Sequence, residues 1–147
     1  MSGTRDLVDL DTSLGYLLKE ASSALRAAME EVLRPLGMTV THYSCLELLA
    51  QRPGLSNSDL ARGAFVTRQS MNVLLQTLER DGVVERSAPV GKVLPTRLTA
   101  RGRRQLQAAS AAVRGVELRM LGGIPHADQA VTLRTLRAMV ASLHPAG

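Results

Sequence analysis

Aromatic residues are scarce in this 147-residue chain: they make up 2% of it, with no Trp, one Phe and two Tyr. Sandwiches, barrels and RNA-binding sheets draw on β-branched and aromatic residues for their packed or stacking faces. The chain is instead rich in helix formers such as Ala, Leu, Arg, Glu and Gln. The composition therefore predicts a mostly α-helical fold, and the length fits one domain.

Cysteine and histidine are also scarce, with one Cys and three His. The single cysteine, Cys45, excludes an internal disulfide and fits a reducing compartment. A zinc site would need several Cys and His at set spacings, which the sequence does not offer. No apolar run approaches the roughly 18 residues of a membrane helix, and the polar, acidic start is unlike a secretory signal. We expect a cytoplasmic protein without a metal, a cofactor or a membrane partner.

Signatures of catalysis are missing as well. The sequence offers no nucleophile–base pair, no paired carboxylates with a plausible pocket and no phosphate-cradling glycine loop. The doublet Gly122-Gly123 is a turn signal and not a nucleotide fingerprint. We therefore do not expect an enzyme.

Positive charge is present, and it is unevenly placed. The net charge of the chain is +5. The stretch from Leu55 to Arg104 holds nine basic and four acidic residues, so this third of the chain carries the entire surplus. Such a concentration is the electrostatic footprint of a module that neutralises phosphates, although charged faces are often only solvated.

Apolar residues recur at helical spacing in the first part of the chain. The first stripe predicts a helix over 12–34, which Asp11 or Thr12 can cap and which Pro35 and Gly37 end.

Three more helices are expected outside the centre of the chain. One opens at Thr39 and ends before Pro53-Gly54, and a long one capped by Thr99 ends before Gly122-Gly123. The last covers 128–143. Because the central module has its own inward residues, the apolar stripes of the terminal helices favour burial against a second copy, and hence a homodimer. The alternative is that these helices complete the core of a monomer.

The middle of the chain begins with a short helix and a tight turn. Ser56 is a natural N-cap for a helix over 55–62, and Asp59 stands where it can mimic a capping box. The turn is Gly63–Val66. A short, glycine-containing turn between two helices is the helix-turn-helix pattern.

The second helix of this pattern is capped by Thr67 and continues through Arg80, with Gly82 placed as its left-handed C-terminal cap. Its expected inward residues are Met71, Leu74, Leu75 and Leu78. Two short strands follow over 83–86 and 96–98, joined by a loop at 88–92. The expected fold is mostly α with a small β-wing, a winged helix-turn-helix.

In this order, the elements resemble the MarR (multiple antibiotic resistance regulator) family of bacterial repressors, over nearly the whole chain. The most specific pieces are Gly54-Leu55-Ser56 with Leu60-Ala61, the run Val66–Arg86, and Leu98–Gly102 after the wing. The resemblance implies a single domain whose centre binds DNA and whose terminal helices form the dimer. The corresponding division is 55–98 for DNA binding, with 12–50 and 99–143 for dimerisation and support.

A recognition helix presents the residues near its start to base edges in the major groove. Arg pairs with guanine, whereas Gln and Asn pair with adenine. We expect contacts to bases or adjacent phosphates from Thr67, Arg68, Gln69, Ser70, Asn72 and Gln76. The preceding helix is expected to touch the DNA backbone through Ser56, Asn57 and Arg62. The alternative is that these are solvated helix residues, with Thr67 and Ser56 acting only as caps.

The wing departs from the commonest form of the family, which carries an Asp-x-Arg tip. Val90-Gly91-Lys92 occupies that stretch, so the acid is missing and Lys stands for Arg. Because Lys is a point charge without a planar fork, we expect Lys92 to supply mainly nonspecific phosphate attraction. Arg86 and Arg97, at the bases of the strands, either touch phosphate or pair with acids such as Glu85.

The resemblance also implies a pocket for a small aromatic or lipophilic effector, between the dimer-forming helices and the DNA-binding lobe. Candidate lining residues are Tyr16, Met38, His42, Tyr43 and Cys45. His42 or an arginine could hold a carboxylate, while Tyr43 and Cys45 are as easily core residues. Cys45 could instead sense oxidation, but a sensor thiol needs exposure and a lowered pKa, and a buried structural thiol is the favoured interpretation.

These observations predict a sequence-specific, double-stranded DNA-binding transcriptional regulator, namely a ligand-responsive repressor that acts as a homodimer. Two-fold symmetry predicts a near-palindromic operator with half-sites about 34 Å apart. The alternative is a winged-helix module that binds another protein and has no specific DNA binding.

Overall fold

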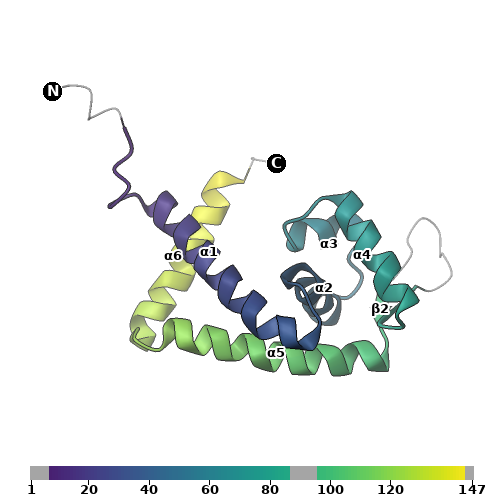
Figure 1. Ribbon diagram of the computed structural model, residues 1–147. Coiled ribbons are helices and arrows are strands. Elements are labelled where there is room, and N and C mark those ends of the chain that lie inside the picture. Colours follow the sequence, from purple (N-terminus) through teal and green to yellow (C-terminus); the bar gives the residue numbers. More distant parts are fainter. Residues whose placement is uncertain (1–6, 87–95, 145–147) are drawn as a thin grey trace. The chain divides into compact units, whose positions relative to one another are not determined.

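The computed structural model describes residues 7–86 and 96–144 of the chain (Figure 1). The predicted fold class is confirmed, because the described elements are helices apart from one pair of short antiparallel strands. No helix in these two ranges is long and apolar enough to cross a membrane. The elements are α1 (Leu14–Leu33), the 3₁₀ turn η2 (Arg34–Leu36), α2 (Val40–Gln51), α3 (Asn57–Gly63), α4 (Arg68–Arg80), β1 (Val84–Arg86), β2 (Thr96–Leu98), α5 (Ala100–Leu121) and α6 (His126–Leu143).

The start of α1 differs from the prediction, which gave the cap to Asp11 or Thr12. Ser13 is the cap, because its hydroxyl accepts a hydrogen bond from the Tyr16 amide at 3.1 Å. Thr12 lies one residue too early, in a turn where its amide donates to the Asp9 carbonyl at 3.2 Å. Both residue types are good caps, so composition alone could not choose between neighbouring positions.

The helix-turn-helix packs around one buried cluster that joins α2, α3 and α4. The α4 side chains of Met71, Leu75 and Leu78 are fully buried, as predicted, and Leu74 is partly buried against the same cluster. Because these residues recur at steps of three and four, they fix which side of α4 faces the core. The opposite side of α4 is left to solvent.

Hydrogen bonds of Thr99 and a close backbone approach at Gly102 connect the strands to the start of α5. The strands pair antiparallel with Val84 opposite Leu98. The Thr99 hydroxyl donates toward the Gly82 and Val83 carbonyls, at 2.6 and 3.0 Å, and accepts from the Gly102 amide at 3.1 Å, so Thr99 is the predicted cap of α5. A Cβ atom at Gly102 would collide with the Val83 carbonyl, so only glycine fits there.

The chain divides into two compact units, residues 1–116 and 117–147. In the first unit, α1 buries only Leu33 and leaves apolar side chains exposed near its start, namely Leu14, Tyr16, Leu17 and Leu18. In the second unit, α6 has no fully buried residue and exposes Val131, Leu133, Leu136, Val140 and Leu143. Both helices therefore carry apolar side chains that are exposed among the described residues.

Candidate nucleic-acid interface

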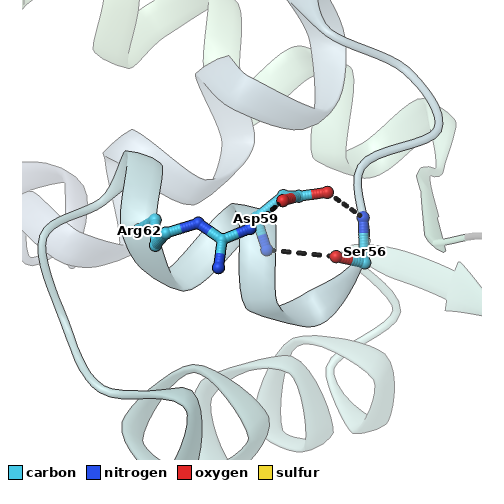
Figure 2. A network of polar contacts seen from close by, with 3 residues as sticks. All are labelled: Ser56, Asp59 and Arg62. Atoms are coloured by element: carbon cyan, nitrogen blue, oxygen red, sulfur yellow. Dashed lines mark hydrogen bonds and ion pairs between the residues drawn. The ribbon is translucent and has the colours of Figure 1, made fainter. Parts of the chain in front are cut away.

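The first turn of α3 is held by a closed polar network (Figure 2). The Ser56 hydroxyl accepts from the Asp59 amide at 3.1 Å, while the Asp59 carboxylate accepts from the Ser56 amide at 3.4 Å. Arg62 completes the network through an ion pair with Asp59. The capping box predicted from the sequence is present, and Ser56 is its cap.

This network also fixes charge on the surface of α3. Hydrogen bonds from Ser56, joined by the bond and charge of Arg62, hold the pKa of the Asp59 carboxyl below its ordinary value. The carboxylate therefore stays ionised and competes with any external anion for Arg62. Arg62 remains well exposed, so its remaining N–H groups can still reach a phosphate.

A side-chain hydrogen bond links α3 directly to α4. The Asn57 amide nitrogen donates to the Asn72 amide oxygen at 2.9 Å. Asn57 and Asn72 are both half-buried. Because the Asn72 oxygen already accepts a bond, its amide nitrogen is the group best placed to serve a ligand. The same oxygen can accept a second bond, so the bond to Asn57 leaves Asn72 able to contact a base or a phosphate.

The first turn of α4 presents polar side chains to solvent. The Thr67 hydroxyl accepts from the Ser70 amide and donates to the Ser70 hydroxyl, each at 3.0 Å, so Thr67 is the cap predicted for this helix. Arg68 and Gln69 are exposed on the same turn, and Gln76 is exposed further along. All three lie outside the buried cluster, as the spacing of the inward residues predicted.

The wing is described only at its strands. Arg86 and Arg97 lie on β1 and β2, where Arg86 faces Thr96 and Arg97 faces Glu85 across the pair. Arg97 is exposed. Arg86 is half-buried, and two of its guanidinium nitrogens have no hydrogen-bond partner among the described residues. Lys92 and the predicted loop 88–92 lie outside the described residues.

The five candidate effector residues all belong to the first unit, and they differ in exposure. Tyr16 is exposed on α1, whereas Met38 and Cys45 are buried in the main cluster. His42 and Tyr43 are half-buried on α2, and the Tyr43 hydroxyl donates to Glu47 at 2.9 Å. Because they span surface and core, the five do not form one evenly accessible group.

Two of these candidates have pKa values shifted by burial. Burial lowers the pKa of His42, against a smaller raising effect of Asp81, so the ring is neutral at pH 7. Its Nε2 is buried and has no hydrogen-bond partner within the described part of the chain. Burial raises the pKa of the Cys45 thiol to about 12, which keeps it protonated and unreactive. These properties favour the structural interpretation of Cys45 over a redox sensor.

The turn between α3 and α4 contains the feature that sequence reasoning missed. The turn was predicted over 63–66, but Gly63 is the last residue of α3, where a Cβ atom would press on the Leu48 side chain. The left-handed residue is Phe65, with φ of 61°. No local signal marks it, because Phe is rare in this conformation.

Comparison with known proteins places these features in a family. The model of the MarR family matches residues 36–92. The HTH-type transcriptional repressor Rv2887 of Mycobacterium tuberculosis is 43% identical over 131 residues, which cover 88% of this chain and 94% of the repressor.

Solved structures of that repressor match the fold. Rv2887 in complex with DNA has a TM-score of 0.70 at 40% identity, covering 87% of this chain and 98% of that chain. Rv2887 in complex with salicylic acid has a TM-score of 0.74 at 42% identity, covering 87% and 96%. The resemblance found in the sequence is thereby confirmed.

Proposed function

The chain belongs to the MarR family, and we propose that it is a transcriptional repressor that binds a near-palindromic operator as a homodimer and responds to a small aromatic acid. The related repressor has been solved with DNA and with salicylic acid, which supports both halves of the proposal. Proteins of this family are DNA-binding regulators and not enzymes, in agreement with the prediction from the sequence.

DNA binding is assigned to residues 55–98, and one observation carries the assignment. Arg68 and Gln69 are exposed on the first turn of α4, while Met71 and Leu75 anchor the other side of that helix in the core. A rigid helix with a polar leading turn is what the major groove accepts. The base-reading set is Arg68, Gln69, Asn72 and Gln76, with Thr67 and Ser70 beside it.

Phosphate contacts are assigned around this set. Asn57 and Arg62 of α3 face the DNA backbone, and Ser56 serves first as a cap and second as a hydroxyl contact. Arg86, Arg97 and Lys92 of the wing add positive charge. Phosphate contacts fix the register of the protein on the duplex but carry little sequence information.

Dimerisation is assigned to the helices in 12–50 and 99–143. Their exposed apolar side chains on α1 and α6 support this assignment, because a single chain gains nothing from leaving them in water. A regulator of this kind works where the DNA is, so we place it in the cytoplasm.

Effector binding is assigned to the neighbourhood of α1 and α2. His42 is the sharpest candidate, because its Nε2 is buried and lacks a hydrogen-bond partner among the described residues. A carboxylic acid could accept or donate at this atom. Tyr16, Met38 and Tyr43 are the apolar candidates beside it in the proposed set, whereas Cys45 contributes only packing.

The test begins with selection of a bound sequence from a library of random duplexes. Fluorescence anisotropy on the selected duplex then compares the wild type with Arg68→Ala and Arg52→Ala, an exposed arginine outside the ranges assigned to DNA binding and to dimerisation. We expect Arg68→Ala to weaken binding about tenfold, since a base-reading Arg contributes about 1–3 kcal/mol. We expect Arg52→Ala to leave it unchanged.

Salt dependence separates specific from nonspecific binding. Affinity for the selected duplex should fall as salt rises, yet withstand excess random competitor DNA. Weak binding that is equal for all duplexes would contradict the proposal and favour a winged-helix module that binds another protein. Equal losses in both arginine variants would contradict the base-reading role of Arg68.

A further inference from the structure

Phe65 occupies a backbone position that aromatic residues rarely take. The end of α3 is closed by two hydrogen bonds, from the Val66 amide to the Ala61 carbonyl at 3.0 Å and from the Phe65 amide to the Arg62 carbonyl at 3.2 Å. This pair of bonds defines the Schellman ending of a helix, in which one residue is left-handed. Phe65 is that residue, with φ of 61°.

The other left-handed positions show which residue the chain uses elsewhere. Within the described residues, the remaining positive φ angles belong to Gly37, Gly54 and Gly82. Glycine adopts this conformation freely because it has no Cβ, whereas an L side chain crowds the backbone. Phe65 therefore maintains a strain that glycine at the same position would remove.

Packing within the chain does not compensate for this strain. The Phe65 side chain is 93% exposed, the highest exposure among the large exposed apolar side chains of the described residues. A ring in water adds no burial to the folded chain. Strained residues of this kind concentrate at functional sites, so the exposed ring points to a contact outside the chain.

The place of Phe65 identifies the partner. It precedes Thr67, the cap of α4, by two residues, and the exposed side chains of Arg68 and Gln69 follow on the next turn. These are the side chains assigned above to the major groove. DNA offers apolar surface there, in the C5-methyl group of thymine and the CH groups of deoxyribose, and Phe is one of the residues that contacts the thymine methyl.

We propose that Phe65 is a DNA-contacting residue whose ring packs against apolar surface of the duplex beside the bases that α4 reads. The proposal rests on the DNA-binding function proposed above and adds a contact of different chemistry to it. The polar residues of α4 read donors and acceptors, whereas Phe65 senses a methyl or sugar surface. Glycine at this position would relieve the strain but would also remove the ring, and with it the contact to DNA.

The test compares wild type with Phe65→Asn and Phe65→Gly, since both replacements accept the left-handed backbone. We expect their thermal midpoints to equal or exceed that of the wild type. On the duplex selected by the wild type, we expect Kd to rise about tenfold, which corresponds to about 1.4 kcal/mol. Val8→Asn, at an exposed apolar residue outside the ranges assigned to DNA binding and to dimerisation, is the matched control and should leave Kd unchanged.

Replacing thymine by uracil in the same duplex identifies the surface. Weaker binding by the wild type, with no further loss in Phe65→Asn, assigns the ring to a thymine methyl. Insensitivity of the wild type to uracil, with the loss in Phe65→Asn retained, assigns it to deoxyribose.

Four results would overturn the proposal. Unchanged Kd in both Phe65 variants removes the DNA contact, and a fall of both thermal midpoints places the ring in the fold. A change confined to self-association makes it a contact between copies of the chain. Failure of the wild type to select any duplex overturns the proposed function itself, and this inference with it.

Discussion

Because Gly102 has no side chain, the start of α5 can pack directly against the backbone at Val83, next to β1. The carbonyl of Val83 lies where a Cβ atom of residue 102 would be, and the Thr99 hydroxyl holds the same backbone in place. The obstacle is backbone and not a flexible side chain, so the surroundings have little room to adjust. The sequence motif Leu98–Gly102 is thus explained by close approach of two backbone segments.

We expect Gly102→Ala to lower the free energy of unfolding by about 1–3 kcal/mol, the usual cost of overpacking a tight site. Gly115→Ala is the matched control on the same helix, because nothing lies within 4 Å of a Cβ atom there. It should be neutral or stabilise by up to about 1 kcal/mol, through the better helix propensity of Ala. Urea unfolding at one protein concentration measures both variants. Equal effects of the two replacements would contradict the close approach at Gly102.

At the scale of elements, the sequence predicted the features that depend only on residues close together in the chain. The caps at Ser56, Thr67 and Thr99 and the left-handed Gly82 each depend on residues within one helical turn, and all are present. The inward side of α4 follows from spacing alone. Neighbouring candidates of equal quality, such as Thr12 and Ser13, could not be separated, because their choice depends on where the chain turns.

Contacts between different elements could not be predicted from the caps and residue spacing of single helices. Asn57 and Asn72 are fifteen residues apart in the chain, and nothing in either helix alone indicates that their amides meet. The left-handed Phe65 was missed because the turn was predicted over 63–66 without a local signal for which of its residues is left-handed. The bond between Asn57 and Asn72 depends on the packing of α3 against α4, which the sequence of neither helix specifies.

The Asn57–Asn72 bond makes a prediction about α3 and α4 as a pair. We expect Asn57→Ala and Asn72→Ala each to weaken operator binding, by about 0.5–1.5 kcal/mol for the shared hydrogen bond. The double variant should lose less than the two single losses combined, because both remove the same bond. Anisotropy on the selected duplex measures the cycle, and circular dichroism checks that helix content is unchanged. Additive losses would mean that the two residues act separately.

At the scale of the whole molecule, the described residues include a helix proposed to read DNA and two helices with exposed apolar side chains. The DNA-reading part is the polar first turn of α4, whose opposite side packs into the buried cluster. The uncovered surface lies on α1 and on α6, each within its own compact unit. A second copy of the chain can cover such surface and at the same time place two reading helices on a two-fold symmetric site.

The proposed function therefore requires two chains on each operator. Sedimentation of the wild type with the selected duplex measures this stoichiometry directly, and a duplex cut to one half-site provides the comparison. We predict two chains per full duplex and binding to the half-site at least about a hundredfold weaker, since the second set of contacts is lost. One chain per duplex, or equal affinity for the full site and the half-site, would contradict the account.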